Sequence, residues 1–253
     1  IQHAVALART LPLTINFQAL LPGLGSAYQA VQQWQEAQGA LAEAEAMAET
    51  LDLGLFRVLA LSRLCMHSAE AGEWDQASRY AVKAIAARRS SDVAVIPQDF
   101  SFHYETGALL RSGDERQARA EVQRLGERLG SYRRFRLPYL QSLAVLAAWD
   151  GESEQAIDHL REAAGLAADL GLPGERWQIL AALGRVSEAV DDPVQARTVF
   201  GEAARIIQEL AEGIKDETLR SRFLAGPPIQ QVVQQAQRLA NQVPQDHVEP
   251  DGR

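Results

Sequence analysis

The sequence contains one cysteine, Cys65, so no disulfide bond can form within the chain, and a lone thiol is typical of a reducing compartment. Lysine is almost as scarce, since Lys83 and Lys215 are the only lysines among 25 basic residues. The net charge of -8 gives the chain no general electrostatic attraction to nucleic acid or to an anionic membrane. We therefore expect a cytoplasmic protein that binds neither nucleic acid nor a membrane.

Motifs for catalysis and cofactor binding are also missing. No G-x-x-x-x-G-K-[ST] loop is present, so we expect no nucleotide hydrolysis by these residues. The five histidines never occur in an H-E-x-x-H arrangement, and no G-x-S-x-G motif is found. We expect no enzymatic activity, no metal and no cofactor. An enzyme remains only as the alternative in which catalytic groups converge from distant parts of the chain.

The sequence shows no clear membrane-spanning or targeting segment. Residues 10–35 are uncharged and long enough to cross a bilayer, but they include Asn16, five glutamines and a break at Pro22. We expect a buried or partner-facing surface there instead. The chain begins at Ile1 without a basic segment or a cleavage site, so no targeting segment is visible.

What the sequence does contain is a repeat. The pattern [Gln/Glu]-Ala-x3-apolar-x2-[Ala/Leu] occurs five times, at intervals of 40, 41, 38 and 40 residues. Such self-similarity is typical of a solenoid, in which no repeat buries its apolar face alone. We expect an all-α, right-handed superhelical solenoid of stacked antiparallel helix pairs with a period of about 40 residues. The alanines of the pattern, called anchor alanines below, are Ala37, Ala77, Ala118, Ala156 and Ala196.

The turn inside each helix pair is predicted five residues before the anchor alanine. Glycine or aspartate there favours the left-handed conformation that ends one helix and starts the next. Small residues also recur twelve residues before the anchor, as in Gly25, Cys65 and Gly184, where they allow the paired helices to approach closely. Cys65 is therefore interpreted as a packed small residue, not as a reactive thiol. The turn positions are Gln32, Gly72, Gly113, Gly151 and Asp191.

The helix pairs divide the chain into an array and a cap. Residues 1–212 are expected to form the array, with a half repeat at 1–11 and five full repeats after it, and residues 213–241 to form capping helices. Residues 1–11 are interpreted as the end of a further helix whose anchor precedes the chain, so we expect the chain to come from a longer solenoid. Pro22 should begin or kink its helix, and the polar residues 242–253 are expected to be disordered. The expected helices span residues 1–11, 16–31, 35–51, 54–71, 74–89, 97–112, 115–130, 136–149, 153–170, 175–190, 193–212, 216–225 and 228–241.

Residues 72–77, Gly-Glu-Trp-Asp-Gln-Ala, followed by Ala81 and Ala84, resemble the tetratricopeptide repeat. A similar match is Trp34-x2-Ala37-x3-Leu41-x2-Ala44, preceded by Leu24-Gly25-x2-Tyr28. The resemblance covers about residues 1–212. The period near 40 departs from the 34 residues of that repeat, and the proline usual at the end of the second helix is absent from most units.

Long repeats of this kind resemble the sensor arrays of bacterial signal-transduction ATPases of the STAND type. Residues 210–225 are similar to the last segment of such arrays. The resemblance implies ATPase and effector domains elsewhere in the same polypeptide, which would act as partners of this array. It implies a non-enzymatic sensor or scaffold that binds a protein partner or a small-molecule or peptide inducer; the alternative is a constitutive interaction scaffold without a ligand response.

Two groups of residues are candidate binding sites. The first occupies the predicted concave face, where mixed polar and aromatic groups can hold a peptide or a small ligand; the alternative is a solvated groove. With only two asparagines, Asn16 and Asn241, the face cannot carry an asparagine ladder for an extended peptide. The concave-face candidates are Arg63, Met66, Phe100, His103, Tyr104, Arg111, Gln141, Arg185 and Glu188.

The second group is a basic cluster interleaved with Tyr132 and Phe135, which can grip an anion or an acidic partner. The alternative is a set of solvated arginines that pair with Glu121 and Glu127. The four tryptophans are interpreted mainly as packing residues. The cluster consists of Arg124, Arg128, Arg133, Arg134 and Arg136.

Overall fold

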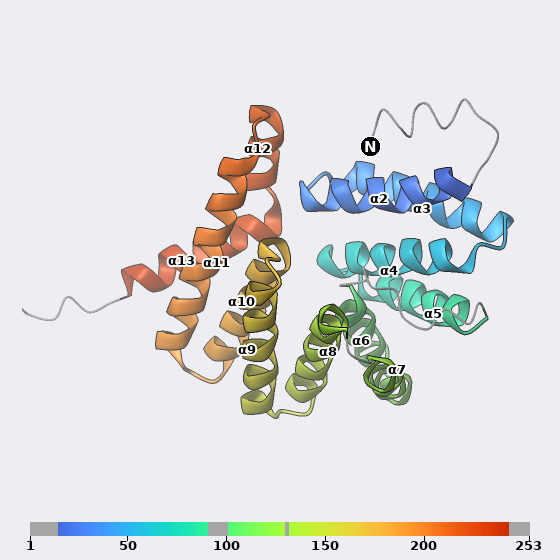
Figure 1. The fold of residues 1–253 in the computed structure, drawn as a ribbon. Helices are drawn as coiled ribbons and strands as arrows, with labels where there is room; N and C mark the ends of the chain where they lie inside the picture. The colour runs from blue at the N-terminus through green and yellow to red at the C-terminus, as the bar shows by residue number, and fades with distance from the viewer. Residues whose placement is uncertain (1–14, 91–100, 130–131, 243–253) are drawn as a thin grey trace, which may run out of the picture.

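The computed structural model describes residues 15–90, 101–129 and 132–242, and these residues form twelve α-helices and one short 3-10 helix, without any strand (Figure 1). The prediction of an all-α chain is confirmed. Where both ends of a helix are described, the bounds agree with expectation within two residues. The expected helix at 1–11, the start of the helix at 97–112 and residues 243–253 lie outside the described residues. The elements are α2 (Ile15–Ala30), α3 (Trp34–Thr50), α4 (Gly54–Glu70), α5 (Trp74–Ser90), α6 (Phe102–Arg111), α7 (Glu115–Arg128), η1 (Arg133–Phe135), α8 (Arg136–Trp149), α9 (Ser153–Asp169), α10 (Pro173–Ala189), α11 (Pro193–Gly213), α12 (Glu217–Leu224) and α13 (Pro227–Asn241).

All five predicted turn positions have a positive φ, between 59° at Asp191 and 84° at Gly113. At each turn the next residue donates its backbone N–H to a carbonyl five residues earlier; one example joins Glu73 to Ser68 at 2.8 Å. This bond satisfies a carbonyl that the end of the helix leaves without a partner. The predicted turns are therefore confirmed, and they reverse the chain within each helix pair.

Close packing of the two helices in each pair depends on small residues. All five anchor alanines are completely buried. A Cβ atom on Gly184 would lie 2.5 Å from the ring of Phe200, and one on Gly25 would lie 2.5 Å from Leu41 Cγ. Cys65 is completely buried at the equivalent place, which agrees with its interpretation as a packing residue. Pro22 does not begin a helix, because α2 starts at Ile15 and includes Pro22 in its interior.

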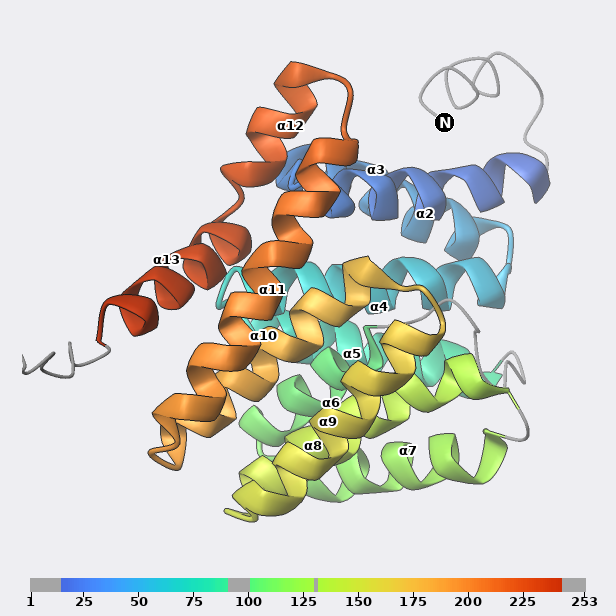
Figure 2. The ribbon, with the colours of Figure 1, turned by 60° about the vertical axis from the view of Figure 1, so that its left-hand side comes forward.

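The helices follow one another around an arc. We call α2, α4, α6, α8 and α10 the inner helices; α2 contacts α4, α4 contacts α6, and α6 contacts α8. Each inner helix also packs against the helix that follows it in the chain, and we call these the outer helices, α3, α5, α7, α9 and α11. The last helix, α13, packs against α11. The arc brings the C-terminal helices around to face the N-terminal pair (Figures 1 and 2). At this seam Gly226 lies so close to Gln32 that a Cβ atom on the glycine would overlap the glutamine side chain.

A buried ionic network joins the middle of the array. Glu105 on α6 is 1% exposed, and it accepts a hydrogen bond from the hydroxyl of Ser62 on α4 at 2.5 Å. Arg88 on α5 donates to both carboxylate oxygens of Glu105, at 3.1 and 3.2 Å. A buried carboxylate needs such partners because it has lost its hydration. Among the described helices, none is both long and apolar enough to cross a membrane.

Candidate functional site

The inner surface of the arc is hollowed by two adjoining cavities. The larger cavity has a volume of about 480 Å³ and is lined by α4, α6, α8, α10 and α13, with Leu160 of α9. The smaller cavity, of about 250 Å³, is lined mainly by α2, α4 and α10. The two cavities share part of their lining, so they form one continuous hollow across the array. The shared residues are Glu70, Tyr104, Trp177, Gln178 and Pro228.

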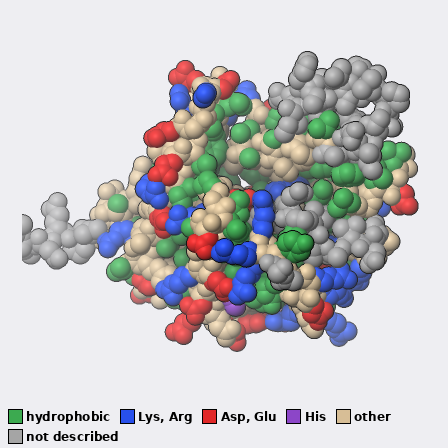
Figure 3. Space-filling model, viewed as in Figure 1, with side chains coloured by type: hydrophobic (Ala, Val, Ile, Leu, Met, Phe, Trp, Pro, Cys, Tyr) green, Lys and Arg blue, Asp and Glu red, His purple; other side chains and the backbone are tan. Residues whose placement is uncertain are grey.

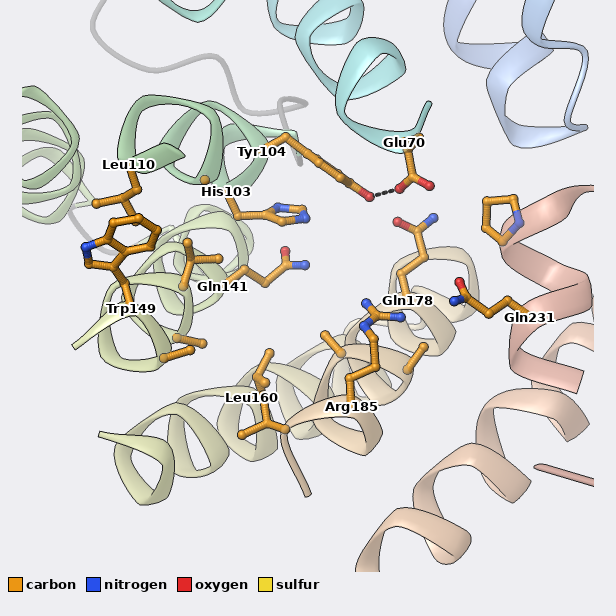
Figure 4. Close-up of a pocket in the computed structure, with 18 of the residues that line it drawn as sticks. Glu70, His103, Tyr104, Leu110, Gln141, Trp149, Leu160, Gln178, Arg185 and Gln231 are labelled. Carbon is orange, nitrogen blue, oxygen red and sulfur yellow. Dashed lines mark hydrogen bonds between the residues drawn. The ribbon is translucent and has the colours of Figure 1, made fainter. Parts of the chain in front are cut away.

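The polar part of the larger cavity is built from side chains that lie far apart in the sequence. Tyr104 on α6 donates a hydrogen bond to Glu70 Oε1 at the end of α4 (Figure 4). Gln178 and Arg185 come from α10, and their side chains point toward this pair (Figure 4). Gln231 of α13 lies beside Gln178, so the capping helix contributes directly to the cavity wall.

The cavity environment changes the proton affinity of two of these groups. Desolvation raises the pKa of the Glu70 carboxyl above its ordinary value, against the opposing effects of the Tyr104 hydrogen bond and the Arg185 charge. Desolvation also raises the pKa of Tyr104, and the adjacent Glu70 carboxylate raises it further. The Glu70 side chain is exposed to water in the hollow, because it lines both cavities where they meet.

The opposite part of the larger cavity is apolar. Leu110 and Trp149 lie side by side there, and Leu160 adds a further apolar side chain to the lining, apart from these two (Figure 4). Trp149 is 48% exposed, so its interpretation mainly as a packing residue is wrong. Trp177 is 6% exposed and lines both cavities, so its predicted burial is confirmed.

Arg111 is held against the wall of the larger cavity. Its guanidinium carbon lies 4.0 Å from the ring centre of Trp74, a favourable cation–π arrangement. Its Nη1 also donates to the backbone carbonyl of Gly107 at 3.2 Å. These contacts leave Arg111 less available to a ligand than an arginine that has no partner.

A buried amide lies in the wall of the smaller cavity. Gln29 is 3% exposed, and its Nε2 donates to the backbone carbonyl of Arg63 at 3.1 Å. Gln29 Oε1 is buried and has no hydrogen-bond partner among the described residues. An acceptor of this kind is costly to bury, and Gln32 Oε1 in the same wall is also buried without a partner among the described residues.

Most of the predicted concave-face residues line the two cavities. Glu188 does not; it forms an ion pair with Arg238 of α13 instead, because α13 packs beside the end of α10. Phe100 lies outside the described residues. The larger cavity brings together His103, Tyr104, Arg111, Gln141 and Arg185, while Arg63 and Met66 line the smaller cavity, to which Tyr104 also contributes.

Sequence reasoning missed Glu70, Gln178 and the contribution of α13. The helical period contains the signal for the first two, because Glu70 lies four residues after Met66 and Gln178 lies seven residues before Arg185. These spacings place each of them on the same helix face as a predicted residue. No local signal identifies α13, since its position depends on the curvature of the whole array.

The basic cluster is largely paired with carboxylates. Arg124 pairs with Glu121, as the alternative interpretation predicted. Arg133 pairs with Asp169 at 2.8 Å and Arg136 with Glu162 at 2.5 Å, both across to α9. Glu127 accepts a hydrogen bond from Gln123 instead of pairing with an arginine. Arg128 and Arg134 also have interaction partners.

These arginines therefore form separate surface contacts, not one open anion site. The same intermingling of acidic and basic side chains is visible over α9 to α12 in Figure 3. In the part of the chain that the structure describes, no group of three or more histidine, cysteine, aspartate or glutamate side chains is arranged to hold a metal ion. No known family model matches the sequence, and no curated protein is significantly similar to it.

Proposed function

We propose that the chain is a non-enzymatic binding array, a right-handed superhelical solenoid of the tetratricopeptide type with a period of about 40 residues. The observation that carries this proposal is the continuous hollow across the inner helices, which α13 borders at its C-terminal side. A hollow of several hundred cubic ångströms with aromatic walls and a few convergent polar groups is typical of a ligand site. We further propose that the array acts as the cytoplasmic sensor of a larger bacterial signalling ATPase of the STAND type. This part of the proposal rests on the sequence resemblance alone.

The proposed signal is a change in the curvature of the arc. The hollow is bordered by α4 and α6 on one side and by α10 and α13 on the other, and we call these two sides the arms of the arc. An occupant of the hollow therefore contacts both arms. One contact between the two ends of the described array lies where Gly226 meets Gln32. An occupant that contacts both arms stabilises one separation of the arms over others, and a ligand shifts a conformational equilibrium by its difference in affinity for the two states.

A cavity-filling variant tests this function. Ala182 lines the larger cavity and is only partly buried, so Ala182→Trp fills space in the hollow. Ala204→Trp on α11 is the matched control, because Ala204 is also partly buried but lines neither cavity. The chain is incubated with a cell extract of small molecules and peptides, and retained compounds are identified by mass spectrometry. We expect Ala204→Trp to retain the same compounds as the native chain and Ala182→Trp to lose them; no retention by the native chain, or equal retention by Ala182→Trp, contradicts the proposal.

A second candidate function is a constitutive scaffold for a protein partner. Val190 is 41% exposed and Val194 is 62% exposed at the turn between α10 and α11. Neighbouring exposed apolar side chains are common at protein contacts. A partner that binds equally well with and without small molecules, and whose binding is lost in Val194→Asp but kept in Ala182→Trp, favours the scaffold over the sensor.

A further inference from the structure

We propose that the larger cavity binds a small carboxylic acid with an apolar body, with the carboxylate at Arg185 and the body against Leu110, Trp149 and Leu160. This inference rests on the proposed function, since it assumes that the hollow is a binding site, and it names the chemical class of the occupant. Two observations support it: the Arg185 side chain points into the cavity, and the polar and apolar walls of the cavity are separate.

Arg185 directs its guanidinium cation into the cavity (Figure 4). Its side chain is exposed to the hollow, and among the described residues it forms neither a hydrogen bond nor an ion pair within 4.0 Å. Its guanidinium group projects toward the centre of the hollow (Figure 4). A guanidinium group has five N–H donors in a planar fork that matches the two oxygens of a carboxylate.

The acidic groups nearest to Arg185 are already engaged. The Glu70 carboxylate accepts the hydrogen bond from Tyr104, and it acts on Arg185 only through its charge. Glu188, one turn further along α10, is paired with Arg238. The chain therefore leaves the donors of Arg185 to an external acceptor.

The rest of the cavity determines the kind of acid that fits. The apolar lining includes Leu110 and Trp149, which form a wall at a distance from the Glu70–Tyr104 pair, and Leu160, which lies apart from both (Figure 4). Burial of an apolar body against such a wall is favourable by about 25 cal/mol for each Å² removed from water. The volume of about 480 Å³ lies within the usual range for small-molecule sites. A small inorganic anion alone would leave the apolar wall in contact with water.

A free small molecule fits the cavity better than a peptide does. The capping helix α13 contributes Pro228, Gln231 and Val232 to the lining, on the side of the cavity opposite α6 (Figure 4). Extended peptides also need side-chain amides that bind successive backbone groups, and three glutamines, at 141, 178 and 231, are the amides in this wall. In this lining the three glutamines come from three different helices, α8, α10 and α13, so they do not form a row along one helix face.

The test uses two probes that differ only in charge, 1-naphthaleneacetate and 1-naphthaleneacetamide, measured by isothermal calorimetry at neutral pH. We expect the acid to bind the native chain about tenfold more tightly than the amide, because only the acid forms a bidentate ion pair with Arg185. Arg185→Gln should weaken the acid by about tenfold and leave the amide unchanged. Arg205→Gln on α11 is the control, since Arg205 pairs with Glu209 and does not line the cavity.

Circular dichroism verifies that each variant is folded, and Arg185→Lys, which keeps the charge, should retain part of the preference for the acid. The inference is wrong if the acid binds no better than the amide, if its preference survives Arg185→Gln, or if neither probe binds at about 1 mM. If Ala182→Trp abolishes the binding of a compound or partner but the acid binds no better than the amide, this inference is wrong and the proposed function remains in place. If the native chain retains no compound or partner in the hollow and the acid also shows no preference over the amide, both this inference and the proposed function are wrong.

Discussion

The phenolic hydroxyl of Tyr104 donates a hydrogen bond to the carboxylate of Glu70, and these two residues lie 34 positions apart on successive inner helices. Both side chains line the larger and the smaller cavity, so the bond marks the boundary between them. It gives α4 and α6 a polar link at the inner surface, in addition to the buried hydrogen bond from Ser62 to Glu105. A ligand that reaches both cavities therefore has to contact or displace this pair.

The raised pKa of Glu70 predicts a specific pH dependence of stability. The carboxyl group of an unfolded chain ionises near pH 4.5, whereas the folded chain holds the Glu70 proton to higher pH because burial disfavours the charged form. Between these two pKa values the folded state binds more protons, so the contribution of Glu70 to stability falls as the pH rises through the folded pKa. The stability of the native chain relative to Glu70→Gln, measured by urea unfolding, should therefore decrease from pH 4.5 upward.

Glu154→Gln, which removes an exposed carboxylate of α9 outside both cavities, is the matched control for this measurement. A difference between the native chain and Glu70→Gln that stays constant, or that grows with pH, would show that burial does not hold the proton on Glu70.

The contact between Gly184 and Phe200 predicts opposite effects for two glycine-to-alanine changes. Gly184→Ala places a Cβ atom 2.5 Å from the Phe200 ring, and displacing a buried ring should destabilise the chain by about 1–3 kcal/mol. Gly201→Ala on α11 has open space around the new Cβ and should stabilise the chain by up to about 1 kcal/mol, because alanine favours the helix. Urea unfolding of both variants compares the two values, and stabilisation by both would mean that α10 and α11 are not closely packed at this point.

The buried ionic network predicts a large difference between two glutamates. Glu105→Gln leaves Arg88 without its closest counter-ion in a buried site and should cost about 3 kcal/mol. Glu115→Gln removes an exposed pair with Arg119 and should cost less than about 1 kcal/mol. Thermal unfolding followed by circular dichroism measures both changes; equal effects would show that the network contributes no more than a surface ion pair.

The positive φ of 59° at Asp191 predicts that glycine is preferred there. An L-residue in the left-handed region is strained by about 1–2 kcal/mol, so Asp191→Gly should stabilise the chain by about 1 kcal/mol. Gln208→Gly in the exposed face of α11 should instead destabilise it by about 0.5–1 kcal/mol, since glycine weakens a helix interior. Denaturation midpoints of the two variants should move in opposite directions, and a lower midpoint for Asp191→Gly would contradict the role of the turn.

The local structure of this chain could be predicted from the sequence because its determinants lie within a few residues of each other. The turn positions depend on the left-handed conformation and on hydrogen bonds over five residues, as at Glu73 and Ser68, and these interactions need no information from the rest of the fold. The same holds for the anchor alanines, whose helical spacing alone places them on the packed face. Seven predicted concave-face residues line the cavities for the same reason, since an inner helix can turn only one face toward the hollow.

The partners of polar side chains could not be predicted in this way. Glu188 shares the spacing of the cavity residues, yet it pairs with Arg238 because α13 returns along α11 and reaches the end of α10. Arg133 and Arg136 similarly pair with carboxylates of α9 that lie 36 and 26 positions away.

The amino-acid sequence by itself thus determined the helices, their turns and the face that each inner helix presents, because these follow from short-range sterics and from the periodic burial of apolar groups. Only the tertiary structure decided that Glu70 meets Tyr104, that α13 borders the hollow, and that Arg185 points into it. Those outcomes depend on how the helix pairs are arranged along the whole array, which forms an arc and brings Gly226 close to Gln32 (Figure 1).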